Sequence, residues 1–306
     1  MINIVFFGTP VIALKSLEYL YNSDKINVLA VVTQPDKPAG RGHKLSMSPL
    51  KEFALSKGLP VFQPKSIRKE PEILEELKKL NPDFFVTFAF GQILSQDVLD
   101  IPKYETINLH ASLLPKYRGA NPIQRAIING EKETGICTMI TELGLDCGDV
   151  CLKEVIPISD NMTCVDLFEQ ISDKSPELIE KTLTGFVENT IKPQKQCEDG
   201  VCMANKLTKE ETLIDWSKPA EEIHNLVRGI YKFPSAYFKY NDKAVKVLET
   251  RVVEGSAPCG EFVRASKEGV IVGCAKDCIL LVKVKPEGKG EMSAKDWANG
   301  QRVIAK

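Results

Sequence analysis

The first two thirds of the chain alternate short apolar runs with amphipathic, charged stretches. The runs at residues 2–7, 26–33, 83–90 and 105–110 are nearly continuous and apolar, as expected of strands buried on both faces. The stretch EPEILEELKKL at 70–80 has the spacing of an amphipathic helix. Strands alternating with helices predict a mainly parallel sheet with crossover helices, which is a Rossmann-like α/β fold.

Two paired strands and a long helix are predicted to complete this first domain. TGICTMIT (134–141) and DVCLKEVIPI (149–158) have strand composition, and residues 163–188 have helical spacing. The pattern changes near residue 190, where IKPQKQCEDGVCMANK has almost no periodicity. We therefore expect a first domain at residues 1–189 and a linker at 190–206.

Short strand candidates dominate residues 207–306. A helical pattern, DWSKPAEEIHNLVRGI, is followed by AVKVLETRVVE, EFVRASKEGVIVGCA and CILLVKVKP, with Gly, Pro and Asp in the turns between them. Several short strands at close spacing favour a small β-barrel of the OB type as the second domain. Two domains are also the expectation for a chain of 306 residues.

Composition limits the classes of protein that fit. Charged residues make up 26% of the chain and the net charge is −1, which excludes a chain that is basic throughout. No apolar run approaches the roughly 20 residues of a membrane-spanning helix, and the first residues fit a strand and a turn better than a signal peptide. We expect a cytoplasmic protein without membrane association. The nine cysteines form no CxxC pair and are expected to be reduced, and no metal site is predicted.

Two segments that follow predicted strands each have two interpretations. FFGTP fits either an anion-binding helix N-terminus or a tight turn, and its single Gly does not make a dinucleotide-binding motif. QPDKPAGRGHKLSMSP (34–49) is long for a loop in a compact domain and is locally basic through Lys37, Arg41 and Lys44. This second segment fits either a phosphate-contacting loop or a solvated one.

A polar pair stands where the strand predicted at 105–110 ends. Asn108 and His110 are two residues apart and share one side of the strand, at the sheet edge where open α/β folds bind ligands. An amide that stabilises an oxyanion and an imidazole that moves a proton suit acyl transfer. Asp146, in the Gly-rich turn LGLDCGDV, is placed to orient His110 and stabilise its charge. The alternatives are a polar strand end and ordinary turn chemistry.

Taken together, these segments resemble a known family. NLH at 108–110, the SLLPKYRGANPI that follows it and the LGLDCGDV turn are similar to the formyltransferases that use 10-formyltetrahydrofolate. The resemblance begins at MINIVFFGTPVIALKSL, continues through the basic insertion at 34–49 and FAFGQIL, and reaches KLTKEETLIDWSKPAEEIHNLVRGIYKFPSAYF. It implies a formyl-transfer domain with a Rossmann-like sheet, joined to a C-terminal barrel that helps to hold tRNA.

The resemblance also implies roles for individual residues. The catalytic asparagine, histidine and aspartate of the family fall on Asn108, His110 and Asp146. Its folate contacts fall on Phe88, Ala89, Phe90, Gly91, Ser112, Leu113, Leu114 and Pro115. Its tRNA contacts fall on Lys37, Arg41, Lys44, Lys206 and Lys209, with Arg41 expected to reach furthest into the tRNA. Arg118 either braces its loop or touches the substrate.

The implied reaction transfers the formyl group of 10-formyltetrahydrofolate to the methionine amino group of a charged initiator tRNA. The resemblance suggests a monomer that acts without a metal. A formyltransferase for an amino sugar or another small amine is one rival, and it would not need the basic insertion. A non-catalytic tRNA-binding module is another, against which Asn108, His110 and Asp146 argue. A hydrolase of the same folate is less favoured because it needs no amine site.

Overall fold

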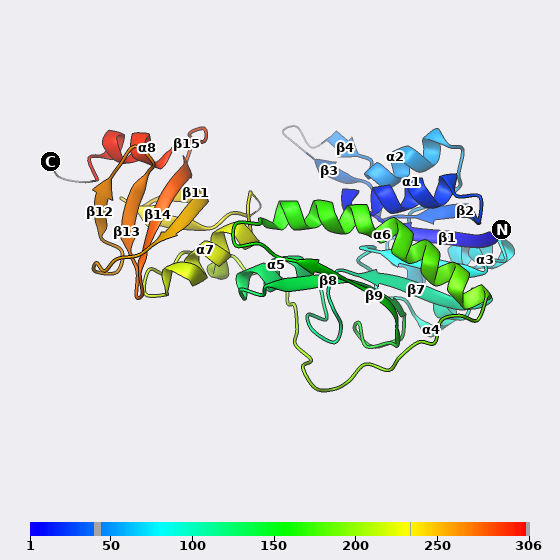
Figure 1. The fold of residues 1–306 in the computed structure, drawn as a ribbon. Helices are drawn as coiled ribbons and strands as arrows, with labels where there is room; N and C mark the ends of the chain where they lie inside the picture. Colours follow the sequence, from blue (N-terminus) through cyan, green and yellow to red (C-terminus); the bar gives the residue numbers. More distant parts are fainter. Residues whose placement is uncertain (40–43, 233, 304–306) are drawn as a thin grey trace. The chain divides into compact units, whose positions relative to one another are not determined.

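The computed structural model describes residues 1–39, 44–232 and 234–303. The described residues form two compact units, and the predicted fold class, an α/β part with a small β part, is confirmed (Figure 1). The first unit comprises the described parts of Met1–Gly119, Thr134–Ile156 and Phe168–Met203. The second comprises Ala120–Glu133, Pro157–Leu167 and the chain from Ala204 onward.

The first unit is built on a seven-stranded sheet with the order β5-β2-β1-β6-β7-β8-β9. The strands are β1 (Ile2–Gly8), β2 (Ile26–Val32), β5 (Val61–Phe62), β6 (Phe84–Phe88), β7 (Glu105–His110), β8 (Glu133–Ile140) and β9 (Val150–Pro157). The pairs from β5 across to β7 are parallel and β7–β8 is antiparallel, so the predicted mainly parallel sheet is confirmed. Strand order reverses between β1 and β6. The carboxyl ends of these two strands are therefore the place where such a fold binds its ligands.

Helices cover both faces of this sheet, as its doubly buried strands require (Figure 1). They are α1 (Leu14–Asn22), α2 (Pro49–Ser56), α3 (Pro71–Lys79), α4 (Gln96–Leu99) and α6 (Cys164–Val187), with single 3-10 turns η1 (Val11–Ala13) and η2 (Ile67–Lys69). Leu77 of α3 and Val98 of α4 pack in one apolar cluster with Phe85 of β6. Phe84, the neighbouring residue, meets Phe186 of α6 with ring centroids 5.8 Å apart. Adjacent residues of β6 thus contact helices on opposite faces.

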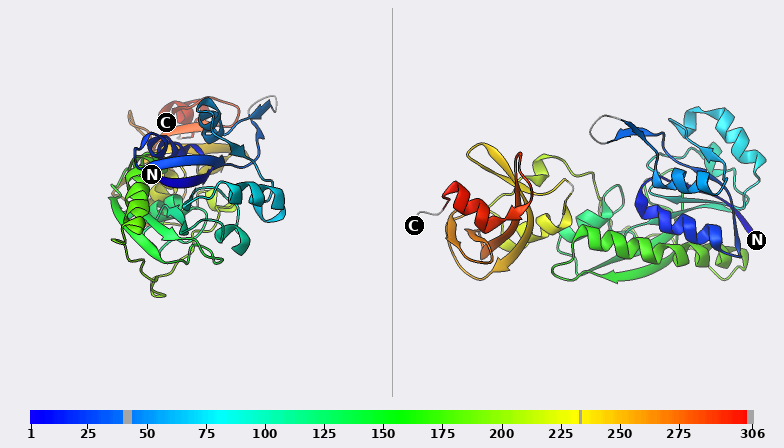
Figure 2. Two further views of the ribbon diagram at one scale, coloured as in Figure 1. Left: turned by 90° about the vertical axis from the view of Figure 1, so that its right-hand side faces the viewer. Right: turned by 90° about the horizontal axis from the view of Figure 1, so that it is seen from above.

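Part of the segment 34–49 forms a hairpin of β3 (Lys37–Ala39) and β4 (Lys44–Ser46), which stands out from the sheet (Figures 1 and 2). Its base is fixed by Lys51, whose Nζ lies 2.6 Å from Asp36 Oδ2 and 2.7 Å from Gln63 Oε1. Hydrogen bonds from Lys51 and Gln63 hold the pKa of the Asp36 carboxyl below its ordinary value. The insertion is thus rooted firmly at its start.

The second unit contains a six-stranded antiparallel sheet, in which five strands have the order β10-β11-β14-β13-β12 and the sixth, β15, pairs with β14. Its elements are α5 (Pro122–Ile128), η3 (Glu210–Thr212), α7 (Ala220–Gly229), β10 (Tyr237–Tyr240), β11 (Lys243–Val253), β12 (Phe262–Ala265), β13 (Val270–Gly273), β14 (Cys278–Pro286), β15 (Met292–Ser293) and α8 (Ala294–Gln301). The two edge strands of this order, β10 and β12, are not paired with each other, so among the described residues the sheet is an open half-barrel. Trp297 of α8 packs against Phe238 and Phe262 in its core.

Candidate functional site

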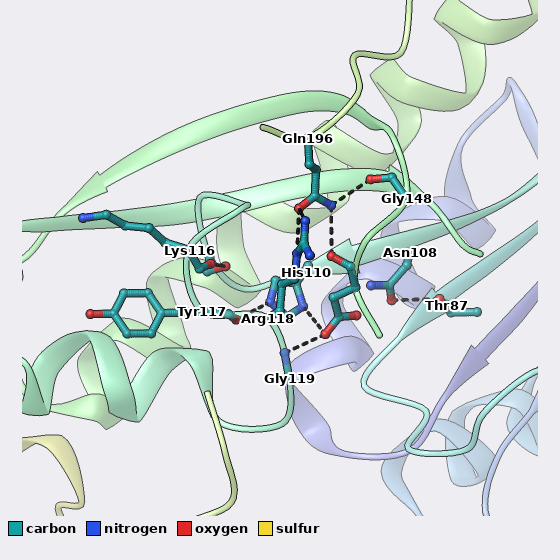
Figure 3. A network of polar contacts seen from close by, with 11 residues as sticks. Thr87, Asn108, His110, Lys116, Tyr117, Arg118, Gly119, Gly148 and Gln196 are labelled. Atoms are coloured by element: carbon teal, nitrogen blue, oxygen red, sulfur yellow. Dashed lines mark hydrogen bonds and ion pairs between the residues drawn. The ribbon is translucent and has the colours of Figure 1, made fainter. Parts of the chain in front are cut away.

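Asn108 is held in a defined orientation by its neighbour in the sheet. It lies in β7 directly opposite Thr87 of β6, and the Thr87 hydroxyl donates a hydrogen bond of 2.8 Å to Asn108 Oδ1. The acceptor end of the amide is thereby occupied, and its Nδ2 points away from Thr87 (Figure 3). Nδ2 is therefore free of this contact and can donate to a ligand at the end of the strand.

His110 ends β7 and is 6% exposed. Its Nε2 lies 2.8 Å from the carbonyl oxygen of Tyr117, and because a carbonyl only accepts, Nε2 must carry a hydrogen. In the neutral ring Nδ1 then has the lone pair, and this atom lies 3.6 Å from Asp146 Oδ2 (Figure 3). The Tyr117 carbonyl fixes the ring, while the carboxylate faces the nitrogen that can take up a proton.

Asp146 is held at both its side chain and its backbone. Its Oδ2 accepts a hydrogen bond of 2.8 Å from the Gly119 N–H, and its carbonyl accepts one of 2.9 Å from Gln196 Nε2. Its φ of 49° is left-handed, a conformation that costs a residue other than glycine about 1–3 kcal/mol and that Asp tolerates better than most. The two hydrogen bonds keep the carboxylate directed at His110 in this conformation.

The structure places the two predicted folate segments as follows. Residues 88–91 lie at the carboxyl end of β6, one of the two strands between which the strand order reverses, and residues 112–115 follow the carboxyl end of β7 at His110. Of the eight predicted residues, Phe88, Phe90 and Leu114 are buried, and Ser112 is buried with its hydroxyl donating to the Lys116 carbonyl at 2.6 Å. Ala89 and Gly91 are exposed with positive φ, and Leu113 and Pro115 are half-buried.

The predicted tRNA residues lie on different parts of the chain. Lys37 is exposed in β3 and its Nζ donates to Gln34 Oε1 at 3.0 Å, while Lys44 begins β4. Arg41 falls outside the described residues. Lys206 and Lys209 are exposed in the second unit.

Four further groups in the site were not found from the sequence. They are the Thr87 hydroxyl, the Tyr117 carbonyl, the Gly119 N–H and the Gln196 side chain. Gln196 belongs to the stretch expected as a linker, yet it is 8% exposed and bonded to the Asp146 turn. Only Thr87 had a sequence signal, because it stands at the end of the strand that neighbours Asn108.

Two family models match the chain. "Formyl transferase" matches residues 2–183, and "Formyl transferase, C-terminal domain" matches residues 206–302. The chain belongs to the formyl transferase family. The curated relatives described below are named as transferases, so the protein is an enzyme, and the non-catalytic module considered from the sequence is not favoured.

Relatives within the family match the chain over nearly its full length. A methionyl-tRNA formyltransferase of Clostridium perfringens is 46% identical over 98% of this chain and 97% of that protein. One of Clostridium tetani is 44% identical over 99% of this chain and 98% of that protein. Among solved structures, methionyl-tRNA formyltransferase from Clostridium thermocellum has a TM-score of 0.60 at 16% identity, covering 95% of this chain and 100% of that one. An N-formyltransferase from Helicobacter canadensis, in complex with folinic acid and dTDP-3-aminofucose, has a TM-score of 0.67 at 24% identity, covering 92% and 99%. These structures share the family's fold.

The described residues also bear on two other kinds of site. No helix among them is long and apolar enough to cross a membrane. Within residues 1–39, 44–232 and 234–303, no group of three or more His, Cys, Asp or Glu side chains is arranged to hold a metal ion.

The cysteines of the chain differ in how deeply their thiols are buried. Burial raises the pKa of the Cys137 and Cys151 thiols to about 12, whereas Cys197 and Cys259 are exposed. Because the thiolate is the nucleophile, iodoacetamide at pH 7.5 is expected to modify Cys197 and Cys259 well before Cys137 and Cys151. Peptide mass spectrometry over a time course measures this order. Earlier labelling of Cys151 would contradict it.

Proposed function

We propose that the protein transfers the formyl group of 10-formyltetrahydrofolate to the α-amino group of methionyl-initiator tRNA, giving N-formylmethionyl-tRNA for translation initiation. The observation that carries this proposal is the identity of 44–46% to relatives named methionyl-tRNA formyltransferase over 98–99% of the chain. The arrangement of Asn108, His110 and Asp146 supplies groups suited to that reaction. A folate-type donor agrees with the folinic acid bound to the Helicobacter canadensis neighbour.

The reaction demands mainly positioning and charge stabilisation. A free α-amino group has a pKa of about 7.7–8.0, and the electron-withdrawing ester of an aminoacyl-tRNA lowers it, so much of the amine is neutral at pH 7. The neutral nitrogen attacks the formyl carbon and its carbonyl oxygen becomes an oxyanion. The Asn108 Nδ2 hydrogens, directed away from Thr87, donate to that oxygen.

His110 moves the proton. The attacking nitrogen loses a proton as the tetrahedral adduct forms, and Nδ1 of His110 accepts it because Nε2 already donates to the Tyr117 carbonyl. The Asp146 carboxylate, 3.6 Å from Nδ1, stabilises the resulting imidazolium. When the bond from the formyl carbon to N10 breaks, N10 takes the proton from His110 Nδ1, and His110 returns to its neutral form.

The folate contacts are proposed at Phe88–Gly91 and Ser112–Pro115, at the carboxyl ends of β6 and β7. Because the side chains of Phe88, Phe90, Ser112 and Leu114 are buried, the surface offered to the folate is made by Ala89, Gly91, Leu113 and Pro115 and by backbone groups. This position beside the reversal of strand order is the usual ligand site of the fold.

We assign tRNA contacts to Lys37, Arg41 and Lys44 of the insertion and to Lys206 and Lys209. In this proposal residues 1–189 form the catalytic domain, residues 190–206 the linker and residues 207–306 the tRNA-binding domain. The enzyme acts in the cytoplasm as a monomer, and light scattering that finds a stable dimer would overturn the latter assignment.

An assay of acceptors tests the proposed function. We expect rapid formylation of charged initiator tRNA and at least about 10³-fold lower kcat/KM for an amino sugar, because phosphate contacts contribute only with the tRNA. Arg41→Glu is expected to raise the KM for tRNA about tenfold or more while leaving folate binding unchanged. Lys69→Glu, at an exposed site on η2, is the matched charge reversal and should change neither. An amino sugar that is formylated with a kcat/KM equal to that for charged initiator tRNA would favour the amino-sugar enzyme instead.

A further inference from the structure

The Gln196 side chain uses all of its hydrogen-bonding groups in the site. Its Oε1 accepts hydrogen bonds from Arg118 Nε at 3.0 Å and from Arg118 Nη2 at 2.8 Å. Its Nε2 donates to the carbonyl oxygens of Asp146 at 2.9 Å and of Gly148 at 2.8 Å (Figure 3). A primary amide has two N–H groups and one oxygen with two lone pairs, so nothing is left to bond elsewhere.

The chemistry of the partners fixes the orientation of this amide. A guanidinium only donates and a backbone carbonyl only accepts, so Oε1 must face Arg118 and Nε2 must face the turn. Arg118 supplies two parallel N–H groups to one oxygen, which holds the amide in a single plane. The interpretation of Arg118 as a brace is therefore the one that these contacts favour.

Gln196 bonds the backbone of Asp146, the residue whose carboxylate faces His110. It bonds the backbone on both sides of Cys147, at Asp146 and Gly148, and so closes the turn around the left-handed Asp146. The carboxylate of Asp146 is fixed at its other end by the Gly119 N–H at 2.8 Å. With both ends held, Oδ2 stays 3.6 Å from His110 Nδ1.

We infer that Gln196 is a positioning residue for formyl transfer, which acts through Asp146 and is itself oriented by Arg118. The inference rests on the proposed function, because it gives Asp146 its part in stabilising the charge of His110. Gln196 touches no reacting atom. It sets the place of the carboxylate, so its loss should affect the rate of the chemical step more than the binding of either substrate.

Gln196→Glu is the sharpest substitution. The new carboxylate has the same shape and keeps its partner in Arg118, but it turns an oxygen toward two carbonyl oxygens and loses both donations to the turn. We expect kcat to fall about 10- to 100-fold, as when other supporting residues behind a site are lost, with each KM changed less than twofold. Gln194→Glu is the matched control. Its side chain is exposed and its backbone pairs with Val150, so we expect unchanged kcat.

A double-substitution cycle separates positioning from general support of the fold. If Gln196 acts through Asp146, adding Gln196→Glu to Asp146→Asn should cause no further fall in kcat. Losses that multiply, or a rise in KM alone, would overturn the inference. If Asp146→Asn by itself leaves kcat unchanged, the proposed role of Asp146 is wrong. If Asp146→Asn lowers kcat but Gln196→Glu remains fully active, the role of Asp146 stands and only the inference about Gln196 is refuted.

A second variant covers the case in which Gln196→Glu does not fold, which thermal melting will reveal. Arg118→Lys replaces the planar guanidinium, which directs two N–H groups at Gln196 Oε1, by a single ammonium nitrogen that cannot reproduce this geometry, so the Gln196 amide is held less firmly. We expect a smaller fall in kcat, about three- to tenfold, again without a change in KM and again absent in the Asp146→Asn background. An unchanged kcat in folded Arg118→Lys would count against the orienting role.

Discussion

Replacing Asn108 by alanine should lower kcat by about 10²- to 10³-fold, with the KM for folate nearly unchanged. That range is the effect of removing one side-chain donor from an oxyanion site, about 3–4 kcal/mol of transition-state stabilisation. In the proposed mechanism the Asn108 amide donates to the oxygen of the formyl group only once charge develops there. Its loss therefore affects the transition state more than the bound substrate, and single-turnover formylation of methionyl-tRNA measures the difference.

Thr87→Val gives a graded comparison. It leaves the Asn108 amide in place but removes the hydroxyl that donates to Oδ1 at 2.8 Å, so the amide is free to rotate. We expect a loss of kcat clearly smaller than that of Asn108→Ala. If Asn108→Ala turns over at a near-normal rate while it remains folded, Asn108 is not the oxyanion donor and the proposed mechanism is wrong at that step.

The placement of Asn108 and His110 could be predicted because it depends on local pattern. Apolar runs of strand length specify β6 and β7, and the period of two puts residues 108 and 110 on one side of the sheet. Parallel strands then end at a common edge. The strand predicted at 278–286 coincides with β14 for the same reason, because its apolar run is bounded by clear turn residues.

The groups that hold His110 and Asp146 in place could not be predicted, because they are backbone groups and a residue far along the chain. The Tyr117 carbonyl, the Gly119 N–H and Gln196 carry no side-chain pattern that identifies them. From the sequence, Asp146 was predicted both to orient the His110 ring and to stabilise its charge. In the structure the Tyr117 carbonyl orients the ring, and this determines which nitrogen has the lone pair in the neutral imidazole.

Several short helices, α5 and α8 among them, were also missed for physical reasons. α5 and α8 have seven and eight residues, too short for apolar periodicity to stand out. For α8 a capping signal exists, since the Ser293 hydroxyl accepts a hydrogen bond of 3.0 Å from the Asp296 N–H. The compact units, in which residues 120–133 and 157–167 group with the C-terminal chain, depend on contacts that no local pattern encodes.

His110→Gln should lower kcat by about 10²- to 10⁴-fold, the range for loss of a positioned general base. Glutamine is close in length and its amide can still donate to the Tyr117 carbonyl, which limits damage to the loop. It has no group that takes up a proton at neutral pH, so the ammonium adduct must lose its proton to water. Because folate and tRNA contacts are not changed, we expect both KM values to stay within about threefold of the parent enzyme.

His224→Gln is a closely matched control for this prediction. His224 Nε2 also lies against a backbone carbonyl, that of Asp160 at 3.1 Å, but its Nδ1 lies 2.9 Å from the Thr250 hydroxyl instead of facing a carboxylate. The two histidines thus carry their hydrogen on Nε2 and differ in the group that Nδ1 faces, a carboxylate for His110 and a hydroxyl for His224. Single-turnover rates should separate them, with His224→Gln keeping the parent rate of formyl transfer and His110→Gln losing it. A His110→Gln enzyme that keeps this rate would show that the amine loses its proton without the imidazole, and Asp146 would then be the remaining candidate base.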